Sequence, residues 1–431
     1  MAMIGTEHWA RNLVLMWFSQ LLVLAGFDAV IPFIPLYLGD QFGITDTALR
    51  GIYVSIFFFA SMLAYAIFCP IWGSLSDRYG VKIMLLRGSF LTAIFFPMMA
   101  YVDEPWMLIG LRFLTAACAG TTVAAQTLIV KTTPENRQGF ALGLFSTAVW
   151  AGAMLGNTLG GLIAHYYGYK STFWFCGILY FMSGIFVLFA KDAPKAAAPP
   201  PRPNTHAAKV YRYRHGALPG FTYGVWLMLF LLLLLRFARQ FEVPYSPMLI
   251  EEIIGTDKAA FWTGIIGAFV SVGAMMSGFV IGYLADRLKP QIFVIPALAM
   301  TALLIVIQAV TDDLFTYGWS RTLTYFFGGG LFPVFQKVLA GATPQRKRGS
   351  VFGWSTTFSN VGAMMSTCFA GWVIVLFGIR GVFMTAALIT IALIPISLWC
   401  ITKAMNQPFY LAHSMEQFGS KKKKKQAVVN P

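Results

Sequence analysis

Charged residues are scarce in this chain. They make up 11% of its 431 residues, and 58% are hydrophobic, whereas an ordinary soluble domain contains about 25% charged and roughly 45–50% apolar residues. This composition excludes an ordinary soluble enzyme. The aromatic content of 16% also excludes disorder over most of the length, because disordered segments contain few aromatic residues.

Signatures of metal sites and of enzymes are absent as well. The five cysteines form no C-x-x-C pair and have no histidine at ligand spacing, so no zinc site is expected. The phosphate-binding P-loop motif, the zinc-protease motif H-E-x-x-H and the hydrolase motif G-x-S-x-G do not occur, which argues against a built-in ATPase and an intramembrane enzyme. We therefore predict that the protein is not an enzyme and has no catalytic residue, no metal and no cofactor.

Long apolar runs fill most of the chain instead. A transmembrane helix needs about 20 mostly apolar residues to cross roughly 30 Å of hydrocarbon, and helices satisfy the backbone hydrogen-bonding groups inside a membrane. An all-α membrane protein with twelve transmembrane helices is predicted. The apolar runs lie approximately at 13–38, 48–72, 83–101, 106–130, 139–164, 172–190, 219–249, 261–284, 291–310, 314–339, 350–377 and 381–402.

Basic and acidic residues alternate along the connections between these runs. The net charge of the whole chain is +15, and its Lys and Arg residues gather in every second connection. By the positive-inside rule, the basic connections and both termini are cytoplasmic. We predict a multi-pass protein of the cell inner (plasma) membrane and assign the positive charge to topology, with no nucleic-acid partner. The other connections hold the acids Asp40, Asp46, Asp103, Glu104, Glu251, Glu252, Asp257, Asp312 and Asp313.

An internal repeat relates the two halves of the chain. Pro32 pairs with Pro244, and Arg112 pairs with Arg321, at an offset of about 210 residues. Two parallel six-helix bundles are typical of a transporter whose site lies between the halves. The predicted regions are an N-terminal bundle at 1–190, a cytoplasmic linker at 191–218, a C-terminal bundle at 219–403 and a basic cytoplasmic tail at 404–431. Within the tail, the lysines at 421–425 lie near anionic lipid headgroups or form a solvated segment.

A glycine-rich and charged loop follows the second predicted helix. It reads Gly73-x-x-x-Asp77-Arg78-x-Gly80-x-Lys82, and it resembles the signature loop of the major facilitator superfamily. The resemblance covers nearly the whole chain and implies the two-bundle fold with twelve transmembrane helices.

A second glycine motif lies on the fifth predicted helix. Gly152, Gly156, Gly160 and Gly161 resemble the antiporter motif of the superfamily's drug/proton antiporter branch, although Asn157 stands where that motif usually has proline. The resemblance implies export. The alternative is that the glycines only allow helices to pack closely, since a four-residue spacing puts three of them on one helix face.

The charged loops are predicted to act as gates. The resemblance implies that Asp77 faces the N-terminal end of helix eleven near Gly349. The repeat adds Asp286, which would face helix five near Gln138, and the gate residue Arg287 beside it. An acid near the positive end of a helix stabilises one alternate state of a transporter. The alternative is ordinary loop charge that follows the positive-inside rule.

Ionisable residues inside apolar runs are expected to carry function, because a charge at a helix centre costs roughly 2.5–3.5 kcal/mol on the insertion scale. Asp28 lies near the middle of the first run, and we predict that it is the protonation site, with Arg112 and Glu242 also taking part in proton coupling. A permanent ion pair between Asp28 and Arg112 is the alternative for the acid. For Arg112 and Arg321, hydrogen bonding to backbone carbonyls of other helices is the alternative.

A cationic cluster on the seventh predicted helix is the candidate substrate site. Arg236, Arg239 and Gln240 fall on one helical face, and with Arg321 they are predicted to bind substrate. Such a face suits a carboxylate or another anion. The alternative is that Glu242 neutralises one of these arginines while the other reaches toward the headgroups.

These residues predict a proton-coupled secondary active transporter that exports small amphipathic molecules by alternating access, as multidrug efflux proteins do. A dedicated exporter of an anionic metabolite, such as a carboxylate siderophore, is one alternative. A non-transporting membrane receptor or scaffold is another. The predicted partners are a small-molecule substrate, protons and membrane lipid, and the protein is predicted to be a monomer.

Overall fold

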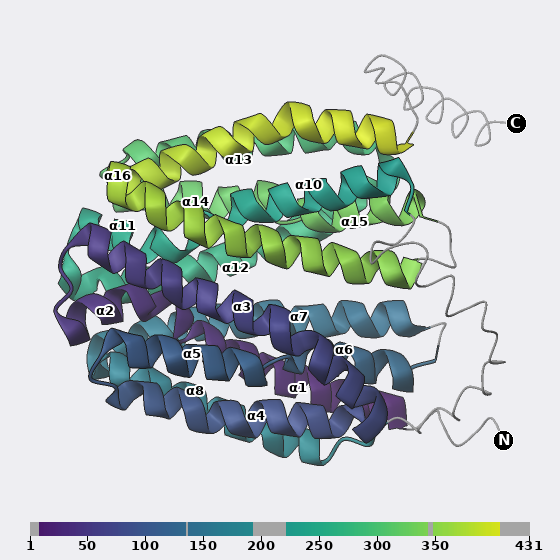
Figure 1. The fold of residues 1–431 in the computed structure, drawn as a ribbon, viewed down its shortest axis with the longest axis horizontal. Helices are drawn as coiled ribbons and strands as arrows, with labels where there is room; N and C mark the ends of the chain where they lie inside the picture. The colour runs from purple at the N-terminus through teal and green to yellow at the C-terminus, as the bar shows by residue number, and fades with distance from the viewer. Residues whose placement is uncertain (1–7, 135–136, 193–220, 344–347, 406–431) are drawn as a thin grey trace, which may run out of the picture. The chain divides into compact units, whose positions relative to one another are not determined.

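The computed structural model describes residues 8–134, 137–192, 221–343 and 348–405. Every regular element within these ranges is a helix, and the long helices of each half run alongside one another in Figure 1. The elements of the first half are α1 (His8–Asp28), η1 (Ile31–Phe33), α2 (Ile34–Phe42), α3 (Thr47–Tyr79), α4 (Val81–Met98), η2 (Met99–Tyr101), α5 (Pro105–Cys118), α6 (Thr121–Thr132), α7 (Gln138–Tyr167) and α8 (Tyr169–Leu188).

The second half follows a similar order of elements, with the single element α16 where the first half has α7 and α8. Its elements are α10 (Tyr223–Gln240), η4 (Val243–Tyr245), α11 (Ser246–Ile254), α12 (Thr256–Arg287), α13 (Pro290–Val310), α14 (Leu314–Gly328), α15 (Leu331–Gly341) and α16 (Arg348–Met405). The first span of each half is broken at the same place. Pro32 lies in η1 and Pro244 in η4. Proline lacks the N–H that would continue an α-helical hydrogen-bond ladder, so each proline interrupts the α-helix.

Ten described helical segments are long and apolar enough to cross a membrane. The longest, Val351–Ala404, contains Gly378 at a φ of +68°, which divides α16 into two helices. The short helices α14 and α15 follow one another closely, separated by Gly329 and Gly330, and together they are long enough for one more span. The predicted all-α membrane fold with twelve transmembrane helices in two pseudo-symmetric bundles is confirmed.

The chain forms two compact units. Unit 1 comprises Met1–Thr45, Ile56–Trp226 and Thr256–Ala268, and unit 2 comprises Asp46–Ser55, Leu227–Gly255 and Phe269–Pro431. Unit 2 therefore includes the first turns of α3, and unit 1 includes the first turns of α12. The predicted bundle boundaries at 1–190 and 219–403 stay a prediction, and most of the predicted linker at 191–218 and tail at 404–431 lies outside the described residues.

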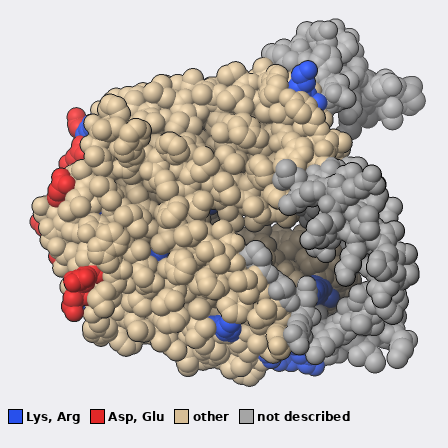
Figure 2. Space-filling model, viewed as in Figure 1, with Lys and Arg blue, Asp and Glu red and all other residues tan. Residues whose placement is uncertain are grey.

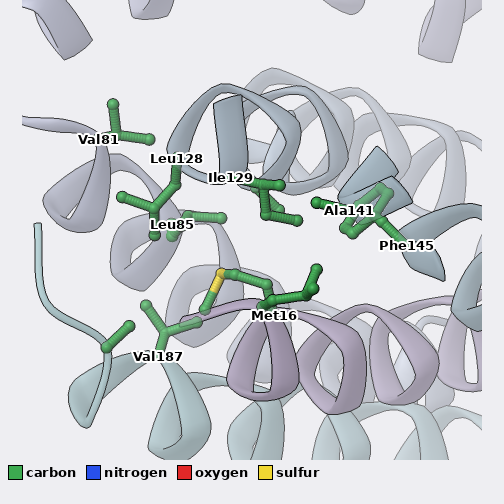
Figure 3. Close-up of a cluster of buried hydrophobic side chains, with 11 residues drawn as sticks. Met16, Val81, Leu85, Leu128, Ile129, Ala141, Phe145 and Val187 are labelled. Carbon is green, nitrogen blue, oxygen red and sulfur yellow. The ribbon is translucent and has the colours of Figure 1, made fainter. Parts of the chain in front are cut away.

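The core of unit 1 gathers around α1, which packs against α7 and α8. Figure 3 shows Met16 of α1 facing Leu85 of α4, Leu128 of α6 and Phe145 of α7, all of them buried. In unit 2, α13 packs against α14 and α16. Both cores are built from aliphatic and aromatic side chains, as the apolar runs predicted.

Charged side chains are rare on the face shown in Figure 2, most of which is tan. The red acidic side chains gather at the left edge, at one end of the helices, and most blue side chains lie away from that edge. This separation of charge along the helices agrees with the alternation of acidic and basic connections in the sequence.

Candidate functional site

Arg112 of α5 is the buried cation of unit 1. Its side chain is buried, and its Nε donates a hydrogen bond to Ser61 Oγ of α3 at 2.6 Å. The guanidinium also lies over the rings of Phe27 and Phe57, 5.2 and 5.5 Å from their centroids. Arg112 therefore holds α5 against α1 and α3 through a hydroxyl and two aromatic faces, where the sequence had offered backbone carbonyls as the alternative.

Asp28 is the last residue of α1, just before the proline break. Its side chain is partly buried, and Cys176 and Tyr180 of α8 lie within electrostatic range of it. Across the described part of the chain no ion pair joins Asp28 to Arg112. The alternative of a permanent ion pair is thus not found in this conformation, and the role of Asp28 as the protonation site stays a prediction.

The glycine motif of α7 lies directly against α1. A Cβ added at Gly156 would come within 2.5 Å of the Ala25 carbonyl oxygen, and one at Gly160 would meet the Cα of Ala29 at 2.5 Å. Gly152 faces Leu21 in the same way. The glycines therefore set the close approach of α7 to the segment of α1 that carries Asp28, as expected for small residues between membrane helices.

The neighbouring motif residues face the first turns of α12, which belong to unit 1. A Cβ at Gly161 would lie 2.8 Å from the Cα of Gly264. Asn157 donates a hydrogen bond from Nδ2 to the Ala153 carbonyl at 2.8 Å, one turn earlier in the same helix. Asparagine thus leaves α7 continuous at the position where the antiporter motif usually has proline.

The predicted gate residues belong only in part to the described side chains. Gly80 adopts a φ of +101° between α3 and α4, a conformation that glycine takes readily, and Lys82 donates to the Leu188 carbonyl at 2.6 Å. Arg287, at the end of α12, stacks on Tyr283 at 3.9 Å. Gly73 lies within α3, and no gate contact is described for it. The side chains of Asp77, Arg78 and Asp286 lie outside the described residues, so the gate contacts stay a prediction.

Unit 2 contains a buried ion pair between Arg321 of α14 and Glu242, which follows α10. The side chains are 5% and 4% exposed. Arg321 also donates to Gln308 Oε1 of α13 at 3.4 Å, and the Gln308 amide in turn donates to Thr324 Oγ1 at 2.8 Å. The predicted substrate residue Arg321 is therefore the partner of Glu242. The alternative that paired Glu242 with an arginine of its own helix named the wrong partner.

The two arginines of α10 have no carboxylate partner within the described ranges. Arg236 and Arg239 are partly buried, and Gln240 is buried. The Arg239 guanidinium lies over the ring of Tyr325, 5.6 Å from its centroid, and the Arg321 guanidinium lies 5.3 Å from the same ring. Tyr325 was missed in the sequence, where the only signal is its position one helical turn after Arg321.

A small cavity of about 30 Å³ adjoins the ion pair, lined by residues of α10, α13, α14, α15 and α16 and by Glu242. Its apolar wall includes Leu298 and Leu393. The polar side chains that line it are Arg239, Glu242, Thr301, Thr324, Tyr325 and Thr390.

A second ion pair of unit 2 joins the start of α3 to α11. Arg50 Nη1 lies 2.8 Å from Glu251 Oε2, and the side chains are only 8% and 15% exposed. The hydroxyls of Ser55 and Tyr245 are hydrogen-bonded at 2.5 Å nearby. The sequence placed Glu251 among the acids of the connections and did not single out Arg50, which lies at the start of the apolar run 48–72.

Residues 16–320 and 228–425 match the family profile described as Major Facilitator Superfamily. The chain belongs to this superfamily. Its membership makes it a multi-pass membrane transporter of small molecules, and the resemblance seen in the loop and glycine motifs is confirmed.

Curated relatives of this superfamily member span nearly its whole length. Multidrug resistance protein MdtG of Rahnella sp. is 28% identical over 401 residues, covering 93% of this chain and 96% of the relative. MdtG of Escherichia coli is 29% identical over 384 residues, covering 88% and 92%.

Solved structures of other superfamily transporters share the fold. The nucleoside transporter NupG matches with a TM-score of 0.72 at 11% identity, covering 90% of this chain and 99% of that one. The transporter PepTSo matches with a TM-score of 0.73 at 13% identity, covering 93% and 99%.

Proposed function

We propose that this superfamily member is a proton-coupled secondary transporter that exports small amphipathic molecules from the cytoplasm by alternating access. The names of its curated relatives support multidrug efflux. The observation that carries proton coupling is the pair of acid and arginine that each unit places within its membrane-spanning helices. In unit 2 Glu242 and Arg321 form an ion pair, and in unit 1 Asp28 and Arg112 form none.

A carboxylate within a membrane must be neutralised either by a proton or by a cation. In this conformation Arg112 bonds to Ser61, so we assign a proton to Asp28. When Asp28 releases that proton, the new negative charge favours a different arrangement of α1 and α5. Exchange of the proton for a substrate at this step would couple the movement of the proton to the export of the substrate.

The membrane potential supplies enough free energy for export. One proton that moves down about 100 mV supplies roughly 2.3 kcal/mol, which supports about a fifty-fold gradient of a neutral solute. The proposed location is the inner membrane, with both termini in the cytoplasm. Protons, small amphipathic substrates and lipid are the proposed partners of a monomer.

Inside-out vesicles with a respiratory proton gradient test this function. Matched cationic, neutral and anionic amphiphiles are added while a pH-sensitive dye reports dissipation of the gradient. We expect the wild type to respond and Asp28→Asn to lose the response. Asp40→Asn, which changes an exposed acid of α2, is the matched control and should respond like the wild type. An unchanged response of Asp28→Asn would remove Asp28 from coupling, and no response to any compound would favour a receptor or scaffold.

A dedicated exporter of an anionic metabolite is the second candidate. It is favoured by Arg236 and Arg239, which have no carboxylate partner within the described residues. Two uncompensated guanidinium groups attract a carboxylate through charge-assisted hydrogen bonds. In the same vesicles, only anions would then dissipate the gradient, and Arg239→Gln would abolish their effect while Arg239→Lys kept part of it. A response to cations or neutral compounds alone would exclude this candidate.

A further inference from the structure

A groove of about 440 Å³ lies along α6 and α7 of unit 1. Its volume is in the range of about 300–1,000 Å³ that is usual for small-molecule sites. The groove is separate from the small cavity beside Glu242 and from the predicted substrate residues, all of which belong to unit 2. Its lining residues include Val123, Gln126, Thr127 and Lys131 of α6 and Leu142 and Ser146 of α7.

The groove lies on the side of the two helices that faces away from the core of unit 1. Leu128 of α6 and Phe145 of α7 are buried in that core (Figure 3), whereas Gln126, Lys131 and Ser146 are exposed. An amide, an ammonium and a hydroxyl on membrane helices are costly to place against hydrocarbon. We therefore expect this face to contact water or a polar ligand.

The lining changes from polar to apolar along α6. Lys131 lies in the last turn of the helix, and Val123 lies about 12 Å away along its axis, since an α-helix rises about 1.5 Å per residue. Gln126 lies between them, and Leu142 of α7 adds to the apolar wall. A ligand that fits this lining has a polar head and an apolar body, as an amphiphile has.

The polar side chains of the groove select the chemistry of the head. Thr127 and Ser146 donate their hydroxyl protons to carbonyls of their own helices, at 2.8 and 2.9 Å, so their lone pairs remain as acceptors. The Gln126 amide makes no hydrogen bond to any residue that the structure describes. Lys131 adds an ammonium, which only donates, and no carboxylate of the described chain lines the groove. This lining favours a neutral or anionic head with hydrogen-bond acceptors over a cationic head.

We propose that this groove binds the neutral or anionic amphiphiles that the protein exports. The inference rests on the proposed export function and names the substrate class for it. The head of the ligand contacts Gln126 and Lys131, and its apolar body lies along Val123 and Leu142. Unit 1 then has a ligand site of its own. An anionic lipid has the same chemistry as such a ligand, so the experiment has to separate the two sources.

Photolabelling of the purified full-length protein in phosphatidylcholine nanodiscs, without a proton gradient, tests this site. Three probes share an octyl chain with a diazirine and differ in the head, which is a carboxylate, a glucoside or a trimethylammonium group. Mass spectrometry maps the labelled peptides, and the concentration dependence of labelling gives the affinity. We expect saturable labelling within residues 123–146 by the carboxylate and the glucoside, and a weaker affinity for the ammonium probe. Preferential labelling by the ammonium probe, or no saturable labelling there, would overturn the proposal.

Two variants connect the label to the groove. Ser146→Phe fills the groove and should abolish saturable labelling. Gln126→Leu removes the amide at similar size and should weaken the affinity about fivefold, the effect of one lost hydrogen bond. Leu144→Phe is the matched control, because Leu144 is an exposed residue of the same helix that does not line the groove. Labelling of both groove variants at the level of the wild type would contradict the proposal.

Lipid competition and the vesicle assay separate the remaining outcomes. If nanodiscs that contain phosphatidylglycerol show no labelling at any probe concentration, the groove is a lipid site and the proposal fails. Labelling that persists in these nanodiscs supports it. In the vesicles, proton flux driven by the same amphiphiles that is unchanged in Ser146→Phe would overturn the groove as a site for exported molecules. Groove labelling without any substrate-driven flux would instead overturn the export function.

Discussion

The two units place an arginine at the same repeat position but surround it differently. Arg321 of unit 2 is held by a carboxylate, whereas Arg112 of unit 1 is held by a hydroxyl and two aromatic rings. Asp28 lies four residues before the matching proline, and Glu242 lies only two residues before its own. Asp28 is also the last residue of α1, whereas Glu242 lies beyond the end of α10 at Gln240. The two acids therefore take different places relative to the arginine of their own unit.

The largest expected effect comes from replacing Arg321, the arginine of the buried Glu242–Arg321 ion pair. Arg321→Gln leaves Glu242 buried without a cation, which costs about 3–5 kcal/mol, whereas Arg112→Gln loses only a hydrogen bond of about 1–3 kcal/mol. Thermal unfolding of both variants in detergent measures the difference. The double variant Arg321→Gln with Glu242→Gln should recover much of the loss. Equal destabilisation by the two single variants would contradict the contrast between the units.

Close packing along α7 is the next effect. Gly156→Ala forces α7 away from the Ala25 carbonyl and should cost about 1–3 kcal/mol of stability, as overpacking does. Gly143→Ala on the same helix is the matched control, because a Cβ there meets nothing within 4 Å and alanine favours a helix. If Gly156→Ala were as stable as Gly143→Ala, the glycine motif would not set the distance between α1 and α7.

The ion pairs of unit 2 provide an internal comparison of burial. Arg50→Gln breaks the buried pair with Glu251 and should lower the free energy of unfolding by about 1–3 kcal/mol. A double variant that swaps the two residues, Arg50→Glu with Glu251→Arg, should restore part of this stability. Arg380→Gln breaks exposed pairs with Glu252 and Asp312, at 2.8 and 2.5 Å, and should cost under about 1 kcal/mol. Thermal unfolding ranks them. The reverse order would show that burial is not what makes the Arg50–Glu251 pair matter.

The smallest expected effect concerns the start of α14. The Asp313 carboxylate accepts hydrogen bonds from the backbone N–H and hydroxyl of Thr316, at 2.7 and 2.8 Å, and these bonds lower its pKa. The cap therefore stabilises α14 fully at pH values above the pKa that Asp313 has in the unfolded chain. This stabilisation is lost as the pH falls through the lower pKa that Asp313 has in the folded protein. Glu104, at the start of α5, makes no side-chain cap bond.

Hydrogen exchange at the first turn of α14 tests this cap. Asp313→Ala should speed exchange at neutral pH, and acidification should remove the difference from the wild type. Glu104→Ala should leave exchange at α5 unchanged. A difference for Asp313→Ala that persists at acidic pH would mean that the carboxylate is not the cap.

The spans were largely predictable because hydropathy depends on composition along the chain. The predicted boundary at 377 and 381 falls at Gly378, where glycine at positive φ ends a helix. The run at 314–339 predicted one helix, yet the structure divides it between α14 and α15 near Gly329 and Gly330. Glycines inside an apolar run do not by themselves predict a break in the helix, because membrane helices also use glycines for close packing.

The candidate site was predictable only as a set of residues. Sequence composition singled out Asp28, Arg112, Glu242 and Arg321, because an ionisable residue in an apolar run is costly whatever its neighbours are. Which of them pair depends on rotation and depth across different helices, and this is a tertiary property. The same holds for Tyr325, whose ring meets two arginines from separate helices.

The sequence by itself determined the membrane fold, the two-fold repeat and the short list of buried charges, since these follow from local hydropathy and spacing. Only the tertiary structure decided that Arg321 takes Glu242, that Arg112 takes Ser61, and that Arg50 meets Glu251. Ion pairs and cavities form between helices far apart in the chain, and a shift of two residues changes the face on which a side chain lies.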